Sequence, residues 1–533
     1  MDAGTVFSAA GVLHVLIVGA VGTHVLLNKQ NEGAAFSWLG IVALSPFFGA
    51  ALYWVFGINR IRRRAQAELP RGHTPEAPGE KDEPRLPVFA SALPTRWQGL
   101  MRLGLAIHPA PYLDGNELTP LIDGDRAYPR MLEAIGSARA SVVLSSYIFE
   151  YDAAGRRFVD ALIAARARGV EVRVLIDGLG VGYGFSPIRS DRVLRRAGVP
   201  TARFLSFLSR SGTRFLNLRN HRKILSVDGR IAFVGGMNIR AGNLLAEPSR
   251  HHTQDVHFAV RGPVIDQINA VFAEDWQFAT RETLDLPSWR RTEAPDVAVP
   301  VANPVAGESA TSPPSTVAEA SPVSAFMPAP SSASGSVAAP VPAAGVSPGA
   351  EATDMVARVL LDGPDDNYQK LQHAIIGAIN VARTSIDVVT PYFLPPNTVV
   401  SALQIASLRG VRVRICVPSR NNLRFVGWAM RANVGKLVGY GIEIVASPPP
   451  FDHSKLCVVD DRWSLIGSSN WDARSLELNF EVNLECYDPA FNARLRALVD
   501  AKCANARPLD GGSRDPLPAR LRNNFFRLFS PYL

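Results

Sequence analysis

Two short segments of the chain repeat the same chemically useful residues. The first, "NHRKILSVDGRIAFVGGMN", begins at Asn220, and the second, "DHSKLCVVDDRWSLIGSSN", begins at Asp452. Each contains His-x-Lys-x4-Asp followed by Gly and Asn, and corresponding residues lie 232 positions apart: His221 and His453, Lys223 and Lys455, Asp228 and Asp460, Asn238 and Asn470. An imidazole can act as a nucleophile or a general acid–base, and an ammonium group attracts oxyanions. The repeat predicts one anion-binding catalytic site built from two related halves, with the six His, Lys and Asp residues as candidate catalytic residues.

Lysine in both motifs is a specific choice. Only seven of the 56 basic residues are lysines, so its use in both motifs indicates that a compact ammonium group is needed. A single buried histidine is usually a satisfied core residue, but a lysine two residues later in both copies argues against that interpretation. Zinc is disfavoured because lysine is a poor ligand and no third His or Cys lies nearby. We therefore expect neither a metal ion nor a cofactor.

The duplicated residues suit the transfer of a phosphodiester. If the two halves pack about a pseudo-twofold axis, both histidines, both lysines and the amides of Asn238 and Asn470 can surround one phosphorus and bind its oxygens. One neutral imidazole would attack phosphorus to give a phosphohistidine, while the other, protonated, would donate to the leaving alkoxide. The residues alone leave open which histidine has which role.

Each imidazole needs a carboxylate on its second ring nitrogen to fix its tautomer and orientation. Asp255, which follows His221 by 34 residues, and Glu481, which follows His453 by 28, are the candidates. Each lies on the next strand-like segment of its own half. Asp228 and Asp460 are better placed to anchor turns and the strands that carry the lysines.

The elements that must position these residues also repeat. "LIDGDRAYPRMLEAIGSARASVVLSSYIF" from Leu121 resembles "LLDGPDDNYQKLQHAIIGAINVARTSIDVVTPYF" from Leu360, and Val- and Ile-rich runs alternate with helix-patterned stretches in both halves. We expect an α/β fold of two homologous sandwich lobes, each a mixed sheet with helices on both faces, packed as a pseudo-dimer. A strand through each motif would place His and Lys on the same side.

The N-terminus has two apolar stretches, residues 6–27 and 35–58, each long enough to cross a bilayer as a helix. Four arginines within residues 60–64 follow the second stretch. The positive-inside rule then places both termini in the cytoplasm, and we expect a transmembrane hairpin. A cleaved signal peptide is the alternative for the first stretch, but it lacks a basic leading region.

Composition divides the rest of the chain. A polar, proline-bearing stretch follows the hairpin, and a stretch of Ala, Pro, Ser, Val and Gly lies between the two motif-bearing halves, where it has little to bury. The expected organisation is a transmembrane hairpin with a basic juxtamembrane segment (1–64), a tether and lead-in segment (65–110), a first lobe (111–290), a disordered linker (291–353), and a second lobe with a basic, aromatic tail (354–533).

The net charge of +8 indicates anionic partners, either phospholipid surfaces, nucleic acid or phosphorylated substrates. The four cysteines lie in the last quarter without metal-type spacing and are interpreted as reduced, mostly buried thiols. The terminal "RLRNNFFRLFSPYL" suits either an interfacial helix on anionic lipid or a tail docked on its own lobe.

With its duplicated His-x-Lys-x4-Asp motif, the chain resembles the phospholipase D superfamily and, within it, the bacterial cardiolipin synthases of the phospholipase D type. Further matching segments include "TPYFLP" and "GSSNWDARSLELNFEVNLECYD". The resemblance implies a membrane-bound phosphatidyltransferase that makes cardiolipin from two phosphatidylglycerol molecules and releases glycerol. It implies His221 as the nucleophile and His453 as the acid–base, with a multi-pass location in the inner membrane and the catalytic lobes on the cytoplasmic side.

Alternatives remain open within and outside this family. A phospholipase D or a phosphatidylserine synthase would use water or serine in place of a lipid alcohol, and no motif reads the acceptor. A membrane-tethered nuclease is disfavoured by the hairpin and by the lack of a lysine-rich groove, so nucleic acid is an unlikely partner and anionic phospholipids are the expected one. A non-catalytic lipid-binding scaffold would not need two complete motifs. The oligomeric state is left unassigned.

Overall fold

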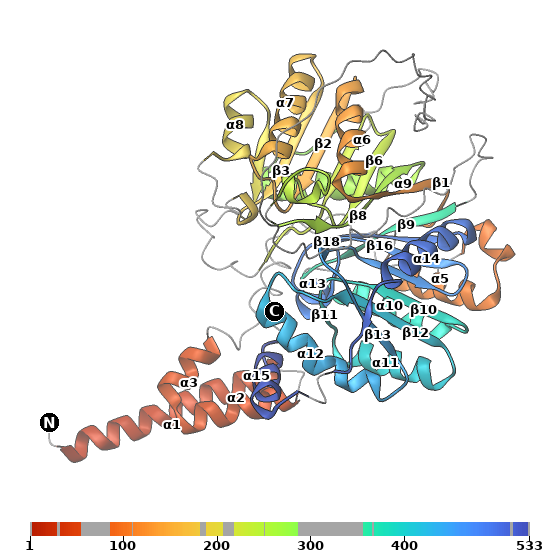
Figure 1. Ribbon diagram of the computed structural model, residues 1–533. Coiled ribbons are helices and arrows are strands. Elements are labelled where there is room, and N and C mark those ends of the chain that lie inside the picture. The colour runs from red at the N-terminus through yellow and green to blue at the C-terminus, as the bar shows by residue number, and fades with distance from the viewer. Residues whose placement is uncertain are drawn as a thin grey trace, which may run out of the picture.

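A computed structural model describes residues 3–28, 32–54, 86–108, 110–181, 188–205, 218–249, 251–285, 355–364, 367–511 and 515–530. The predicted linker at 291–353, and residues 65–85 and 109 of the predicted tether and lead-in segment, lie outside these residues. The described part consists of two α/β lobes and a set of N-terminal helices that project from them (Figure 1).

The two lobes share one sheet of 15 strands whose order is nearly palindromic. The first lobe contributes, from the centre outward, β1 (Leu113–Ile122), β8 (Val256–Arg261), β6 (Ile231–Gly235), β5 (Ile224–Val227), β2 (Ser141–Ser146), β3 (Glu171–Asp177) and β4 (Thr201–Phe204). The second contributes β9 (Met355–Asp362), β18 (Glu481–Tyr487), β16 (Trp463–Gly467), β15 (Leu456–Val459), β10 (Ser385–Val389), β12 (Arg412–Pro418) and β13 (Glu443–Ser447), with β19 (Arg507–Pro508) at the edge. The predicted duplication is therefore present in the strand order.

Each half of the sheet is mixed, as predicted. In the first lobe β2, β3 and β4 run parallel, whereas β5, β6, β8 and β1 pair in antiparallel fashion. All six residues of β2 are buried, as expected for a strand covered on both faces. The halves meet at β1 and β9, which pair only at Leu113 with Ala357 and at Asn116 with Met355.

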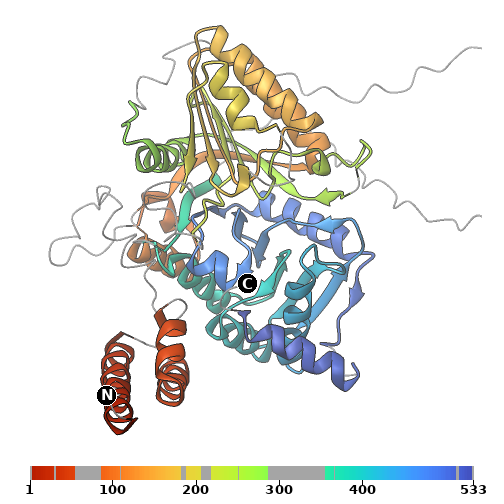
Figure 2. The same ribbon diagram turned by 90° about the vertical axis from the view of Figure 1, so that its left-hand side faces the viewer.

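Helices cover both faces of the sheet (Figures 1 and 2). In the first lobe α6 (Asp123–Ser137), α7 (Ala153–Ala167) and α8 (Ser190–Arg196) pack on one side and α9 (Val264–Thr280) on the other. In the second, α10 (Lys370–Val381), α11 (Asn397–Leu408) and α12 (Arg424–Val438) correspond to the first set and α14 (Pro489–Cys503) to α9. One apolar core contains residues of both α9 and α14, so the lobes are packed together rather than merely linked.

Sequence signals account for several helix starts. Asp152 begins α7 by accepting a hydrogen bond from the backbone N–H of Gly155 at 2.9 Å. Asp472 does the same for the short α13 (Ala473–Glu477) through the N–H of Ser475, at 2.7 Å. That cap fixes the segment directly after Asn470.

Short cross-lobe strands bring the two motifs together. β7 (Thr253–Gln254) of the first lobe pairs with β14 (Phe451–Asp452) of the second, immediately before His453. An isolated bridge joins Asn220 to Phe480, immediately before His221 and Glu481. β11 (Phe393–Leu394) pairs with β17 (Trp471–Asp472) within the second lobe. The backbone itself therefore places each motif histidine against the opposite lobe.

The N-terminal helices follow the predicted apolar stretches only in part. α1 (Ala3–Asn28) contains an 18-residue window, from Gly11 to Asn28, long and apolar enough to span a membrane, and 6% of that window is buried. The second stretch is divided at Ser45 into α2 (Glu32–Leu44) and α3 (Pro46–Leu52) because Pro46 cannot continue the helix hydrogen bonding. A single unbroken second span over 35–58 is therefore not present in the described residues.

A lead-in segment connects to the second lobe rather than to the first. It contains the 3-10 helix η2 (Val88–Ala92) and α5 (Thr95–Ile107), which packs against α10. Behind α5, the fully buried Arg358 bonds to Glu485 at 2.7 Å and to the carbonyl of Gly104 at 2.8 Å. This buried ion pair fixes the segment that leads from the N-terminal helices onto the sheet.

Candidate active site

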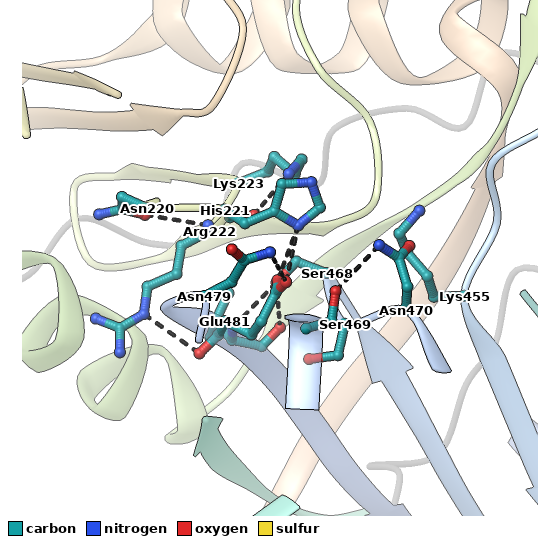
Figure 3. Close-up of polar contacts among 12 residues, drawn as sticks. Asn220, His221, Arg222, Lys223, Lys455, Ser468, Ser469, Asn470, Asn479 and Glu481 are labelled. Carbon is teal, nitrogen blue, oxygen red and sulfur yellow. Dashed lines mark hydrogen bonds and ion pairs between the residues drawn. The ribbon is translucent and has the colours of Figure 1, made fainter. Parts of the chain in front are cut away.

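His221 is positioned by a backbone contact with the second lobe. Its N–H donates to the carbonyl of Phe480 at 2.9 Å, which brings its side chain beside the next residue, Glu481. Nδ1 of His221 lies 3.0 Å from both carboxylate oxygens of Glu481 (Figure 3). The second ring nitrogen, Nε2, is thereby left out of the contact with this carboxylate.

His453 has the equivalent arrangement with the first lobe. Its N–H donates to the carbonyl of Gln254 at 2.7 Å, and its Nδ1 lies 2.9 Å from Oδ2 of Asp255. The side chains of His221 and His453 are 11% and 12% exposed, and both carboxylates are completely buried. Each imidazole thus faces one carboxylate, as expected, but the partner lies on the other lobe.

This crossing corrects the pairing inferred from the sequence. We expected Asp255 to orient His221 and Glu481 to orient His453 because each carboxylate follows its histidine on the next strand of the same half. The structure pairs His221 with Glu481 and His453 with Asp255. The reason is the cross-lobe strand pairing, which a reading of each half by itself cannot contain.

The two imidazoles face each other across the interface. Their ring centroids lie 6.5 Å apart with planes at 79°. A separation of this size allows the two rings to contact one tetrahedral group from two sides. The predicted convergence of both motifs on a single pocket therefore agrees with the arrangement of the rings.

The motif lysines lie in the same pocket and are buried. Nζ of Lys223 donates to the carbonyl of His221 at 2.6 Å, and Lys455 contacts the carbonyl of His453 in the same way. Residues 221–223 precede strand β5 rather than belonging to it, so the lysine curls back onto its own motif instead of standing beside His on a regular strand. The expected strand through the motif is thus displaced by a few residues.

Burial dominates the electrostatics of the pocket. It lowers the pKa of Lys223 to about 7 and of Lys455 to about 8, against the opposing effect of the two carboxylates. Burial also lowers the pKa of His221 to about 4 and that of His453 well below its usual value, with the lysines acting in the same direction. Burial therefore favours neutral imidazoles, and the carboxylates offset only part of its effect on the two lysines.

The carboxylates differ from each other. Burial raises the pKa of Asp255 to about 6. Burial would raise the pKa of Glu481 as well, but His221, Lys223 and the Ser468 hydroxyl together hold it below its ordinary value. Glu481 is thus the more firmly ionised of the two.

The predicted phosphate-binding amides flank the pocket unequally. Oδ1 of Asn238 accepts from the N–H of Ile148 at 3.0 Å. Nδ2 of Asn470 donates to Oγ of Ser475 at 3.1 Å, and its Oδ1 is buried without a hydrogen-bond partner. Asn470 lies beside Lys455 (Figure 3).

The aspartates of the two motifs lie elsewhere. Asp228 accepts hydrogen bonds from the backbone N–H groups of Arg139, Ala140 and Ser141, the last two at 2.7 and 2.8 Å. Asp460 does the same for residues 383–385. Strand β5 or β15 separates each aspartate from its lysine, five residues or about 17 Å along the chain at about 3.3 Å per residue. The prediction that Asp228 and Asp460 belong to the catalytic residues is therefore corrected. They anchor the starts of β2 and β10, in agreement with the other role considered from the sequence.

Sequence reasoning missed the residues around Glu481. Oγ of Ser468 donates to its Oε2 at 2.5 Å, and Nδ2 of Asn479 donates to its Oε1 at 3.3 Å. Gly236 occupies the place of Ser468 in the first lobe, where a Cβ would meet both oxygens of Asp255 at 2.7 and 2.9 Å. The sequence already indicated this difference between the lobes, since Gly-Gly-Met-Asn and Gly-Ser-Ser-Asn differ at this position.

Aromatic residues and one arginine complete the surroundings. Tyr147 lies edge-on to His221 with centroids 5.1 Å apart, and Tyr392 lies edge-on to His453 at 6.5 Å. Arg222, between the first-motif His and Lys, donates to Asp275 at 2.6 Å and to the carbonyl of Glu481 at 3.2 Å. Among the described residues, no group of three or more His, Cys, Asp and Glu side chains could hold a metal ion.

The paired motifs can now be compared with known proteins. The profile of the family described as "Cardiolipin synthase, PLD-like domain" matches residues 131–276 and 375–502, one match in each lobe. The chain belongs to this phospholipase D-like family. Its two lobes are therefore phospholipase D-like domains, and the enzyme is a phosphatidyl-transferring member of the family.

Relatives align over nearly the whole phospholipase D-like chain. A cardiolipin synthase of Alkalihalophilus pseudofirmus is 28% identical and the alignment covers 98% of this chain and 93% of that protein. Cardiolipin synthase A of Pseudomonas entomophila is 29% identical, with 98% and 97% covered. Cardiolipin synthase A of Pseudomonas fluorescens SBW25 is 30% identical, with 88% and 86% covered.

A solved structure shares the fold. The phosphatidylserine synthase of Haemophilus influenzae Rd KW20 superimposes with a TM-score of 0.55 at 14% identity, covering 82% of this chain and 100% of that chain. The similarity at this level of identity concerns the two-lobed phospholipase D-like architecture.

Proposed function

We propose that this protein makes cardiolipin by transferring the phosphatidyl group of one phosphatidylglycerol to a hydroxyl of a second, with release of glycerol. The observation that carries the proposal is the pair of facing imidazoles, each held by a carboxylate of the opposite lobe, between two buried lysines. The full-length similarity to cardiolipin synthases supports the choice of substrates.

In the first step the lone pair on Nε2 of one histidine forms a bond to phosphorus, and the bond from phosphorus to the glycerol oxygen breaks. The proton on Nε2 of the other histidine passes to that oxygen, so that neutral glycerol leaves. Lys223, Lys455 and the amides of Asn238 and Asn470 neutralise and bind the phosphoryl oxygens. The phosphate anion also raises the pKa of the acid histidine, which burial and the nearby lysines otherwise keep low.

In the second step a hydroxyl of another phosphatidylglycerol gives its proton to the second histidine and attacks phosphorus. The bond between phosphorus and nitrogen breaks and the first histidine returns to its neutral form. One phosphodiester replaces another, so the covalent intermediate retains the free energy of the bond until the lipid alcohol arrives. Exclusion of water from the pocket then separates synthesis from hydrolysis.

We assign the nucleophile to His221 and the acid–base to His453. The firmly ionised Glu481 behind His221 increases electron density on the free ring nitrogen. Asp255 has no hydroxyl donor like that of Ser468 beside Glu481, because Gly236 stands in the equivalent position. Asp255 and Glu481 act as positioning residues, since each touches the imidazole and not the reacting phosphorus.

We infer a location in the inner membrane, with the N-terminal helices as the anchor and the catalytic lobes on the cytoplasmic side. Support comes from the apolar α1 and from the arginines at residues 60–64. We retain two membrane passes as the topology, with α2 and α3 together forming the second. We infer that anionic phospholipids of this membrane are the partners of the protein.

The proposal is tested with purified full-length enzyme, labelled phosphatidylglycerol and a chelator. We expect labelled cardiolipin in the wild type and none in His221→Ala or His453→Ala. Phosphatidic acid as the main product would indicate a lipase, and phosphatidylserine formed only when serine is added would indicate a serine transferase. Either result would replace the proposed reaction.

A further inference from the structure

The C-terminal helix exposes an apolar stripe although it is docked on its own lobe. α15 (Leu517–Arg527) packs against α12, with the ring of Phe526 5.0 Å from that of Trp428. On its opposite side Leu517, Leu521, Phe525 and Leu528 are exposed, Leu521 by 63% and Leu528 by 70%. Their spacing of four, four and three residues is that of one helix face. The helix thus has one apolar face more than its packing uses.

The same surface is positively charged. Arg424, Arg431 and Lys436 on α12 and Arg520 and Arg522 on α15 are exposed, and neither helix contains an acidic residue. Burial and the nearby Arg527 lower the pKa of Lys436, so two like charges stand close together. An apolar stripe flanked by excess arginine and lysine is complementary to an anionic lipid interface, which offers acyl chains and phosphate groups together.

Side-chain contacts connect this surface with the candidate active site. Tyr392, edge-on to His453, donates its hydroxyl to Oδ1 of Asn422 at 2.8 Å, just before α12. Phe425 at the start of α12 lies 6.5 Å from Phe526 of α15, between ring centroids. These contacts, together with the three-residue step along the chain from Asn422 to Phe425, connect the second-motif histidine with the exposed helices.

We propose that the exposed faces of α12 and α15, here called the α12–α15 surface, hold the second lobe and its part of the candidate active site against the anionic lipid bilayer. This contact is additional to the anchor formed by the N-terminal helices, and it rests on the proposed function in taking a bilayer lipid as substrate. Figures 1 and 2 both place α15 toward the end of the body where α1–α3 also lie. The surface would then shorten the path from bilayer to pocket and keep water from it.

The test measures whether α15 enters the lipid phase. The full-length enzyme is reconstituted in nanodiscs of phosphatidylglycerol, with a bimane probe on Leu521→Cys in one sample and on Arg196→Cys, on exposed α8 of the first lobe, in another. Brominated acyl chains should reduce the fluorescence at 521 about twofold and leave that at 196 unchanged. The labelled parent chain supplies the background from the native cysteines.

Two further measurements separate lipid contact from catalysis and test the role of the positive charge. The same quenching in a chain that also carries His221→Ala separates lipid contact from catalysis, so the contact can stand even if the proposed reaction fails. Charge reversal by Arg520→Glu should lower the ratio of turnover on bilayers to turnover on dispersed short-chain phosphatidylglycerol, whereas Arg196→Glu should not. Equal quenching by brominated lipid at positions 521 and 196 would overturn the proposal. Quenching at position 521 that requires a second labelled copy of the chain, and not brominated lipid, would also overturn it.

Discussion

The imidazole of His221 is held by the carboxylate of Glu481, 260 residues away on the opposite lobe. His453 depends in the same way on Asp255 of the first lobe. Neither phospholipase D-like lobe therefore contains a complete histidine–carboxylate pair. The duplication works as a mutual arrangement in which each half orients the reactive group of the other.

Substitution of the two carboxylates should affect different steps. In Glu481→Gln an amide can donate to Nδ1 and favour the tautomer with the proton on Nε2, so attack on phosphorus should slow about 100-fold. Asp255→Asn should slow protonation of the leaving group instead. With a phosphatidyl ester of p-nitrophenol, which leaves without protonation, the loss should persist in Glu481→Gln and shrink in Asp255→Asn. Equal recovery in both variants would contradict the crossed pairing of roles.

Removal of the Ser468 hydroxyl should shift the pH dependence. The hydroxyl stabilises the ionised form of Glu481, so in Ser468→Ala the pKa of this carboxyl should rise. The acid limb of the pH profile of kcat/KM should therefore move to higher pH, with a kcat about tenfold lower at neutral pH. Ser469→Ala is the matched control, since its hydroxyl bonds to Asn483 and not to the carboxylate. A profile displaced equally in both variants would indicate a general packing effect.

Lys223→Met should exchange activity for stability. Its folded pKa of about 7 lies below the ordinary 10.5, so the buried ammonium destabilises the fold fully below pH 7 and this penalty disappears as pH approaches 10.5. The variant should melt a few degrees higher at pH 7 and show little gain at pH 10. Its kcat/KM should fall about 100-fold or more, through loss of phosphoryl charge stabilisation. A lower melting temperature at pH 7 would show that the lysine supports the fold.

Asp228→Ala should damage the fold and leave the chemistry intact. Its carboxylate binds three backbone N–H groups, and the residue has a φ of 53°, which alanine adopts only with strain. We expect a loss of roughly 1–3 kcal/mol in unfolding free energy, measured by denaturant titration. The kcat of the folded fraction should stay within about twofold of wild type. A stable variant without activity would place Asp228 in the reaction itself.

The periodic features of the fold could be predicted from the sequence. Buried strands such as β2 and β3, the helices between them and the duplication all follow from local patterns. The break at Ser45 was foreseeable from Pro46, but the apolar character of the whole stretch masked it. The join between β1 and β9 and the single sheet it creates depend on lobe packing, for which the sequence has no local signal.

The candidate site was predictable in its residue types and less so in its contacts. The motif histidines and lysines stand out because their identities and spacing repeat. The carboxylate partners were correctly chosen as residues, but the bridge from Asn220 to Phe480 redirects them across the interface. Ser468 and Asn479 act through Glu481, and such support becomes visible only when the carboxylate has a position.

The most direct test of the account is a stoichiometric burst with the p-nitrophenyl phosphatidyl ester. His453→Ala should release about one equivalent of p-nitrophenol per chain and then stall, because the acceptor alcohol lacks its base. Mass spectrometry under alkaline conditions should find the phosphatidyl group on His221. His221→Ala should give neither burst nor adduct. A burst of equal size in His221→Ala, or an adduct on a residue other than His221, would contradict the account in which His221 attacks a phosphorus held between the two imidazoles.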